Sequence, residues 1–248
     1  MLKEERYDKI LKILDEEKYI SSKELAKHLF VSMPTIRRDL ACLEKTKQVV
    51  RSHGGARKIN DDNMVLPLDF RETINHSEKK RLCDAASKFI KDDSIVFMDG
   101  STTVMQLAEF ISTKQNVTVV TNGIPASLIL AKKGIKTYST GGELLENSMA
   151  YAGSFAEEFI HKFNIDICFF SSHGVNKNGV IVDTSLPETQ FRNAVILQSD
   201  KSVFLCDKTK FGVNAPYNLM SVCDVDYIIS NCDSSNPFLQ RTGVTIVA

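Results

Sequence analysis

The chain has 248 residues, of which 43% are hydrophobic and 25% charged, so it can bury one large core or a large and a small one. This composition excludes a disordered or collagen-like chain. The charge is balanced overall, but residues 1–58 carry 14 Lys and Arg against nine Asp and Glu, and residues 59–248 carry 17 against 22. A basic head on an acidic body favours a nucleic-acid-binding module joined to another domain, although a solvated helical face gives the same count.

No stretch of about 18 uncharged apolar residues occurs, and the first residues lack the apolar core of a signal peptide. We therefore expect a soluble, cytoplasmic protein without a membrane partner. The six cysteines lie far apart, with no C-x-x-C pair and no histidine at zinc spacing. We expect them to be small apolar packing residues, and we expect neither a metal nor a cofactor.

Three helices are predicted in the head. Apolar residues at helical spacing predict the first over residues 4–17. Ser21, followed by Glu24, reads as a capping box that opens the second helix. Ser32 caps the third, with Pro34 in its first turn, and the buried face of this helix carries Ile36, Leu40 and Leu43.

The outer face of the third helix combines small and basic residues, namely Pro34, Arg37, Arg38, Ala41 and Lys45. Arginines on an exposed helix suit a major groove, where they can donate two bonds to guanine, but an ordinary solvated face is the alternative. Residues 49–51 predict a strand, and residues 53–58 predict a glycine turn flanked by positive charge. Together these features predict a winged helix.

Two strings carry a family resemblance. Residues 31–40 read V-S-M-P-T-I-R-R-D-L, and residues 51–56 read R-S-H-G-G-A. At this spacing they resemble the N-terminal winged helix-turn-helix of the DeoR family of bacterial transcriptional regulators. Lys47 departs from the family pattern, which has a glycine at the end of the recognition helix.

The resemblance implies that Arg37 and Arg38 contact DNA, while Asp39 stays on the protein as the partner of a nearby basic group. Thr35 would bond a phosphate or fix the start of the helix. The candidate DNA-binding residues are Ser32, Pro34, Thr35, Arg37, Arg38, Ala41, Lys45, Arg51, His53 and Arg57.

We expect a winged helix-turn-helix over residues 1–58, a linker over 59–75 and an α/β domain over 76–248. Ser77 is predicted to cap the first helix of this body. Beyond it, short apolar strands alternate with helical segments, which predicts a largely parallel sheet. The predicted strands cover residues 94–98, 117–120, 136–139, 166–170, 202–206 and 227–230.

Polar residues follow five of these strands, at the ends where α/β sheets bind ligands. The five loops are residues 99–103, 121–123, 140–143, 171–174 and 207–210. A glycine with three hydroxyl residues at a helix start, as in residues 100–103, suits a phosphate, although polar loops are also the default way to end a strand. Neither a dinucleotide fingerprint nor a phosphate-loop motif is present.

The DeoR resemblance extends through the body and implies a domain similar in fold to ribose-5-phosphate isomerase that senses phosphorylated sugars. It implies a phosphate cradle at Ser101, Thr102 and Thr103, with Lys210 as counter-charge. His173 departs from the family, which commonly has an acidic residue there; a loop histidine bonded to backbone is the other interpretation. The candidate effector-binding residues are Asp99, Gly100, Ser101, Thr102, Thr103, Thr121, Asn122, Gly141, Gly142, Glu143, His173, Asp183, Glu188 and Lys210.

These features predict a homodimeric or larger transcriptional regulator, a repressor of a carbohydrate-utilisation operon that a phosphorylated sugar releases from double-stranded operator DNA. A sugar-phosphate isomerase with an accessory DNA-binding head is the alternative, because the body holds enough acid and base groups for it. A winged helix that binds another protein is a third hypothesis, which the basic face and wing disfavour.

Overall fold

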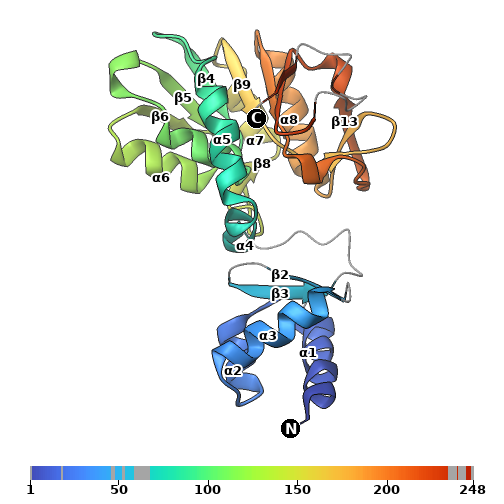
Figure 1. Ribbon diagram of the computed structural model, residues 1–248. Coiled ribbons are helices and arrows are strands. Elements are labelled where there is room, and N and C mark those ends of the chain that lie inside the picture. The colour runs from blue at the N-terminus through green and yellow to red at the C-terminus, as the bar shows by residue number, and fades with distance from the viewer. Residues whose placement is uncertain are drawn as a thin grey trace. The chain divides into compact units, whose positions relative to one another are not determined.

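A computed structural model describes residues 2–17, 19–45, 48–51, 54–58, 68–233, 239 and 244–246. It divides into two compact units, a head unit of residues 1–74 and a body unit of residues 75–248 (Figure 1). The candidate His53, the family departure Lys47 and residues 59–67 of the predicted linker lie outside the described residues.

The head unit contains the three predicted helices. Its elements are α1 (Lys3–Glu17), β1 (Tyr19–Ser21), α2 (Ser22–His28), α3 (Met33–Lys45), β2 (Val49–Arg51), β3 (Gly55–Lys58) and α4 (Leu68–Thr73). The capping box at Ser21 is confirmed, because its hydroxyl accepts the Glu24 N–H at 3.1 Å while the Glu24 carboxylate accepts the Ser21 N–H. The core of this unit is formed by apolar side chains from all three helices and the wing, including Ile10, Leu14, Leu25, Ile36, Leu40, Leu43 and Val49.

The wing is a three-stranded antiparallel sheet in the order β1-β3-β2. Strand β1 was not predicted, and β3 was predicted as a turn because of its glycine pair. Gly55 is instead required for close packing, since a Cβ there would lie 2.2 Å from the Ile20 carbonyl oxygen. The glycine thus lets β3 approach β1.

An ion pair connects α1 to the recognition helix. The Arg6 guanidinium donates to both carboxylate oxygens of Asp39, whose side chain is 4% exposed. This confirms that Asp39 stays on the protein. The Asp39 carboxylate raises the pKa of Arg6 through this hydrogen bond.

We predict that Arg6→Ala destabilises the protein by about 3 kcal/mol, because it leaves the Asp39 carboxylate buried without its partner. Denaturant unfolding of the full chain measures the change. Lys9→Ala, which removes an exposed pair with Glu5, is the control and should have no measurable effect. An equally small effect of Arg6→Ala would contradict a structural role for the pair.

The body unit is built on a seven-stranded sheet in the order β15-β14-β12-β9-β4-β5-β6, and every adjacent pair in it is parallel. The strands are β4 (Ile95–Met98), β5 (Thr118–Thr121), β6 (Lys136–Ser139), β9 (Ile167–Phe170), β12 (Ser202–Leu205), β14 (Tyr227–Ser230) and β15 (Val244–Ile246). The first six confirm the predicted strands, while β15 was not predicted. The chain is therefore a winged helix joined to a parallel α/β domain.

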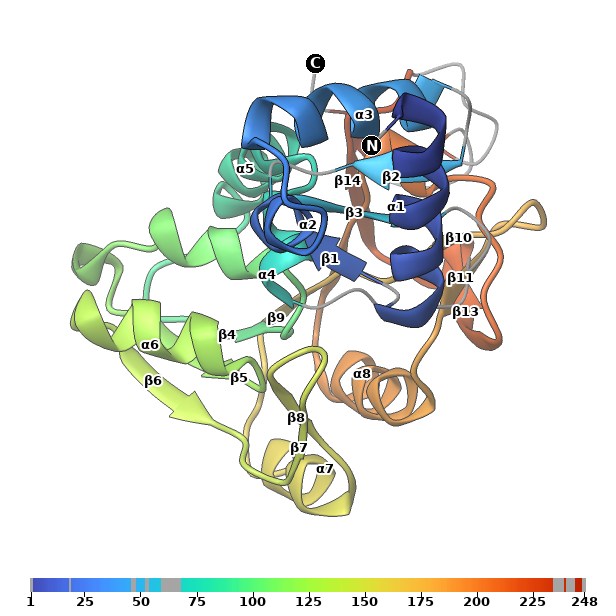
Figure 2. The same cartoon turned by 90° about the horizontal axis from the view of Figure 1, so that it is seen from below.

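Helices cover both faces of this sheet (Figures 1 and 2). On one face Val96 and Met98 pack with Leu82 of α5 (His76–Ser87) and with α6 (Ile124–Lys132). On the other, Phe97 packs with α7 (Ser154–Ile160) and α8 (Leu186–Gln198). Burial on both faces explains why the strands are continuous apolar runs in the sequence.

Shorter elements complete the body. Two small antiparallel sheets are formed by β7 (Glu143–Leu145) with β8 (Ala150–Ala152), and by β10 (Gly174–Val175), β11 (Val180–Asp183) and β13 (Tyr217–Ser221). Within the described part of the body, the 3-10 turns are η1 (Val104–Glu109), η2 (Thr113–Gln115), η3 (Lys208–Lys210) and η4 (Val222–Asp224).

Two further predictions are corrected. Helix α5 begins after Asn75, which has a φ of 51°, and the Ser77 hydroxyl donates to the Glu78 carboxylate, so Ser77 is not the cap. The cysteine prediction holds for Cys83, Cys168 and Cys206, which are buried, but is wrong for the exposed Cys223. Burial raises the pKa of the Cys168 thiol to about 12.

None of the described helices is long and apolar enough to cross a membrane.

Candidate DNA-binding and effector sites

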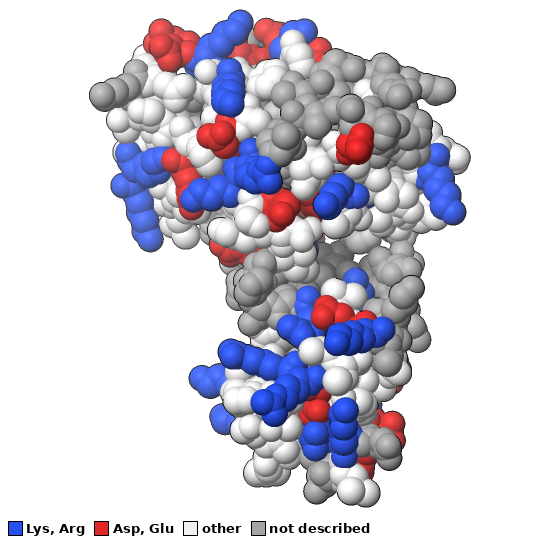
Figure 3. Space-filling view, viewed as in Figure 1, with Lys and Arg blue, Asp and Glu red and all other residues white. Residues whose placement is uncertain are grey.

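The exposed face of α3 carries the predicted basic residues. Pro34, Arg37, Arg38 and Lys45 are exposed and Ala41 is half-buried, while Ile36, Leu40 and Leu43 are buried. Figure 3 shows Lys and Arg side chains gathered over the head unit. The helix therefore offers positive charge around a small residue, as a groove-binding helix requires.

Hydroxyl groups fix the start of this helix. The Thr35 N–H donates to Ser32 Oγ at 3.4 Å, and the two hydroxyl oxygens lie 2.9 Å apart. Of the two roles considered for Thr35, the geometry supports fixing the helix start. In the wing, Arg51 lies 3.8 Å from the Glu44 carboxylate, and half-buried Arg57 donates to the Lys58 carbonyl.

The switch point of the body sheet lies between β4 and β9. Strands β4, β5 and β6 extend to one side of this point and β9, β12, β14 and β15 to the other. Ligands of open parallel sheets bind beyond the carboxyl ends of the strands at such a point. Here those ends are Asp99 and Ser171.

Asp99 connects the two loops. Its Oδ1 accepts the Ser101 N–H, and its Oδ2 accepts the Ser171 N–H, each at 3.0 Å. The same Oδ2 accepts Nε–H of Arg192 at 3.2 Å, and Nη1 of Arg192 donates to Asp183 at 2.9 Å. All three charged side chains are buried.

Arg192 was not predicted, because a lone arginine in a helix normally signals a solvated face. Burial opposes its charge, but Asp183 and Asp99 outweigh this effect and raise the pKa of Arg192. Glu188, half-buried in the first turn of α8, contributes in the same direction. Asp99 and Asp183 therefore shape the site through Arg192.

We predict that Arg192→Met destabilises the chain by about 3–5 kcal/mol, because two carboxylates remain buried without their shared cation. Denaturant unfolding followed by circular dichroism measures the loss. Lys201→Met, at the exposed pair with Asp226, is the matched control and should change little. If Arg192→Met were as stable as the parent, the ion triplet would not organise these loops.

A buried lysine lies behind the predicted phosphate loop. Lys79 of α5 is 4% exposed, and its Nζ donates to Thr102 Oγ1 at 3.0 Å. Lys210, the predicted counter-charge, instead donates to Ser171 Oγ at 3.0 Å and to the Ser172 carbonyl at 2.7 Å. The loop leads into the six-residue 3-10 turn η1 and not into the α-helix whose N-terminus was expected to attract a phosphate. The positive charge at Thr102 is instead the ammonium of Lys79.

The polar groups of the neighbouring loops differ in whether they already have a hydrogen-bond partner in the protein. Thr121 Oγ1 accepts the Gly123 N–H, and Asn122 Nδ2 donates to the Tyr151 carbonyl at 2.8 Å. Asn122 Oδ1 is buried and has no hydrogen-bond partner among the described residues. This oxygen can accept a hydrogen bond from a ligand hydroxyl. Thr103 is buried, and its carbonyl accepts the Cys83 thiol.

Gly100 is needed for close packing of these loops. A Cβ there would lie 2.6 Å from Ala150 Cβ and 3.4 Å from Gly123 Cα. The Thr140 N–H donates to the Thr121 carbonyl, which places the loop after β6 beside the loop after β5. Contacts therefore join the loops after β4, β5, β6 and β9.

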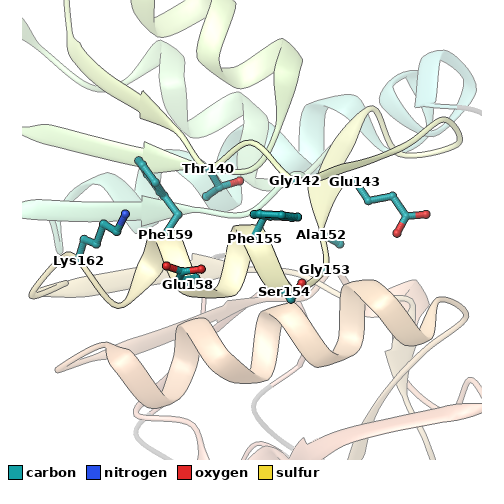
Figure 4. A pocket seen from close by; sticks show the side chains of 10 residues that line it. All are labelled: Thr140, Gly142, Glu143, Ala152, Gly153, Ser154, Phe155, Glu158, Phe159 and Lys162. Atoms are coloured by element: carbon teal, nitrogen blue, oxygen red, sulfur yellow. The ribbon is translucent and has the colours of Figure 1, made fainter.

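Part of the predicted set lines a cavity beside α7. Thr140, Gly142 and Glu143 line a cavity of about 870 Å³ together with Ala152, Gly153 and residues of α7 and its end, Ser154, Phe155, Glu158, Phe159 and Lys162 (Figure 4). Glu143 lies at the opposite end of this view from Phe159 and Lys162. Gly141, with a φ of 63°, directly precedes the lining residue Gly142 in the chain. His173 is half-buried in the loop after β9.

The first turn of α5 contacts three elements around the site. Asn75 Nδ2 donates to Asp207 Oδ1 at 3.4 Å and to Thr209 Oγ1 at 3.3 Å. His76 Nδ1 lies 3.0 Å from Gln106 Nε2 in η1. With Lys79, these contacts bind the start of the body unit to the loops after β4 and β12.

Family profiles match both units. The DeoR-like helix-turn-helix domain matches residues 6–62, and the DeoR C-terminal sensor domain matches residues 74–232. The chain belongs to the DeoR family. It is a DNA-binding transcriptional regulator and not an enzyme, because its relatives over nearly the full chain are named as regulators and repressors.

Among these relatives is the HTH-type transcriptional regulator YulB of Bacillus subtilis, 32% identical over 93% of this chain and 90% of the relative. The glycerol-3-phosphate regulon repressor of Escherichia coli is 28% identical over 93% and 92%. The lactose phosphotransferase system repressor of Staphylococcus aureus is 32% identical over 86% and 85%. A solved D-ribose-5-phosphate isomerase aligns over 55% of this chain and 54% of its own, at 16% identity and a TM-score of 0.40, a likeness that does not bear on function.

Proposed function

We propose that this regulator is a repressor of carbohydrate-utilisation genes that binds operator DNA through α3 and the wing and is released by a phosphorylated sugar bound in the body unit. The contact of buried Lys79 with Thr102 carries the effector proposal, because an ammonium held beside a hydroxyl-rich loop suits a phosphate. The names of the E. coli and S. aureus relatives as repressors support the direction of regulation. Because its proposed target is operator DNA, we expect it in the cytoplasm.

On the DNA, Arg37 and Arg38 of α3 provide donors for base edges or phosphates, and Pro34 and Ala41 let the helix approach closely. Arg51 and Arg57 of the wing are proposed to contact the DNA backbone, as is His53, which lies outside the described residues. One small winged helix makes few contacts, so tight specific binding requires paired half-sites. We therefore expect a homodimer or a larger homo-oligomer.

We predict that Arg38→Ala weakens binding to the regulator's own upstream DNA by about 1–3 kcal/mol if Arg38 contacts a base. The loss should be smaller on random DNA, which only phosphate contacts hold. Fluorescence anisotropy at fixed salt measures both. Arg81→Ala, at an exposed arginine of α5, is the control. Unchanged specific affinity of Arg38→Ala would remove this role.

In the body unit, the proposed phosphate lies at Ser101, Thr102 and Thr103, with Lys79 as its counter-charge. Asn122 Oδ1 is the proposed acceptor for a sugar hydroxyl, because it is buried and no described residue donates to it. Lys210 holds the loop after β9 through Ser171 and Ser172. Gly142 and Glu143, which line the α7 cavity, are proposed to contact the far end of the sugar.

We predict that Lys79→Met abolishes the effector response, with effector binding at least about tenfold weaker, while DNA binding remains. Methionine keeps the length and apolar stem of lysine and removes the buried charge. Titration calorimetry with a panel of sugar phosphates measures effector binding, and DNA anisotropy measures release. Lys80→Met, at the neighbouring exposed pair with Glu109, should respond like the parent. Normal effector sensitivity of Lys79→Met would refute the assignment of Lys79.

Release requires that the effector favour one conformation of the repressor, and a difference of about 1–3 kcal/mol gives the usual range of coupling. The contacts of Asn75, His76 and Lys79 support a route for this coupling. They tie the first residues of the body unit to the proposed phosphate loop, to η1 and to the loop after β12. A shift of these loops on binding would move the point where the chain leaves the body.

A further inference from the structure

Phe30 occupies the turn between α2 and α3 in an unfavourable state for an aromatic residue. Its φ is 53°, in the left-handed region, and the residue is 94% exposed. A left-handed backbone costs a residue with a Cβ about 1–2 kcal/mol relative to glycine. A fully exposed ring contributes nothing to the core.

The turn itself does not require a phenylalanine. Backbone bonds hold it, since the Phe30 N–H donates to the Lys27 carbonyl and the Val31 N–H donates to the Ala26 carbonyl. Its neighbours Leu29 and Val31 pack against the core of the head unit instead. Glycine or asparagine would form the same turn with less strain.

The surroundings of Phe30 indicate what contacts the ring. The chain passes directly from Phe30 through Val31 to Ser32, which caps α3, and then to exposed Pro34. Exposed Lys27 and His28 precede it on α2. The ring is therefore an apolar group in the turn of a basic helix-turn-helix, where the complementary partner is a polyanion with apolar patches. Duplex DNA has this character, because thymine methyl groups line its major groove.

We propose that Phe30 contacts operator DNA beside the recognition helix and packs its ring against a thymine methyl group. The inference rests on the proposed use of α3 as the DNA-reading helix. It adds an apolar determinant to a surface that otherwise offers charge. Phe30 favours thymine at one operator position, and its unfavourable conformation in the free protein is retained for this contact.

The test compares Phe30→Asn with the parent on the regulator's own upstream DNA by fluorescence anisotropy. Asparagine tolerates the left-handed backbone, so the melting temperature of the Phe30→Asn variant should equal or exceed that of the parent. Its affinity for this DNA should fall by about fivefold or more. DNA in which deoxyuridine replaces thymidine lacks the methyl groups. This replacement should lower the DNA affinity of the parent and leave that of Phe30→Asn nearly unchanged.

Three results would overturn the inference. Phe30→Asn could bind like the parent, deoxyuridine could weaken both proteins equally, or Phe30→Asn could change the oligomeric state in light scattering, which would make the ring a contact between copies. Arg38→Ala separates this failure from that of the proposed function. If Arg38→Ala weakens binding while Phe30→Asn does not, only the role of Phe30 is wrong; if neither does, α3 is not the reading helix.

Discussion

The buried triplet of Asp99, Arg192 and Asp183 is the interaction on which the body unit depends. It joins the loops after β4 and β9, the two strands between which the strand order reverses, to helix α8. A buried arginine is tolerated only because two carboxylates offset the loss of its hydration. Asp99, which shares this charge, also accepts the Ser101 N–H of the proposed phosphate loop.

A second buried charge contacts the same loop. The Lys79 ammonium of α5 donates to Thr102 Oγ1. The acidic partners of Arg192 thus serve the fold, while the ammonium of Lys79 lies beside Thr102 at the proposed phosphate site. Because α5 also begins the body unit, the residue proposed to sense the anion lies four residues from the junction with the head. Sensing and transmission then require no separate pathway through the body.

The sequence predicts elements better than it predicts charged contacts. Apolar runs between turn residues identified six of the parallel strands, and periodicity with caps identified the three head helices. The errors have particular causes: Gly55 was interpreted as a turn although it allows strand packing, and Ser77 was interpreted as a cap although Asn75 precedes the helix. Lys79 and Arg192 look like solvated helix charges in sequence, because only tertiary packing buries them.

The proposed function requires that a phosphorylated sugar lower the affinity of this DeoR-family regulator for specific DNA. Fluorescence anisotropy of the full chain on DNA from upstream of its own gene, at fixed salt and with a panel of sugar phosphates, tests it most directly. We expect specific binding that one phosphorylated sugar reverses and its unphosphorylated form does not. Specific binding that no member of a broad sugar-phosphate panel changes would contradict the effector proposal, and no preference over random DNA at any salt would contradict operator recognition at this site.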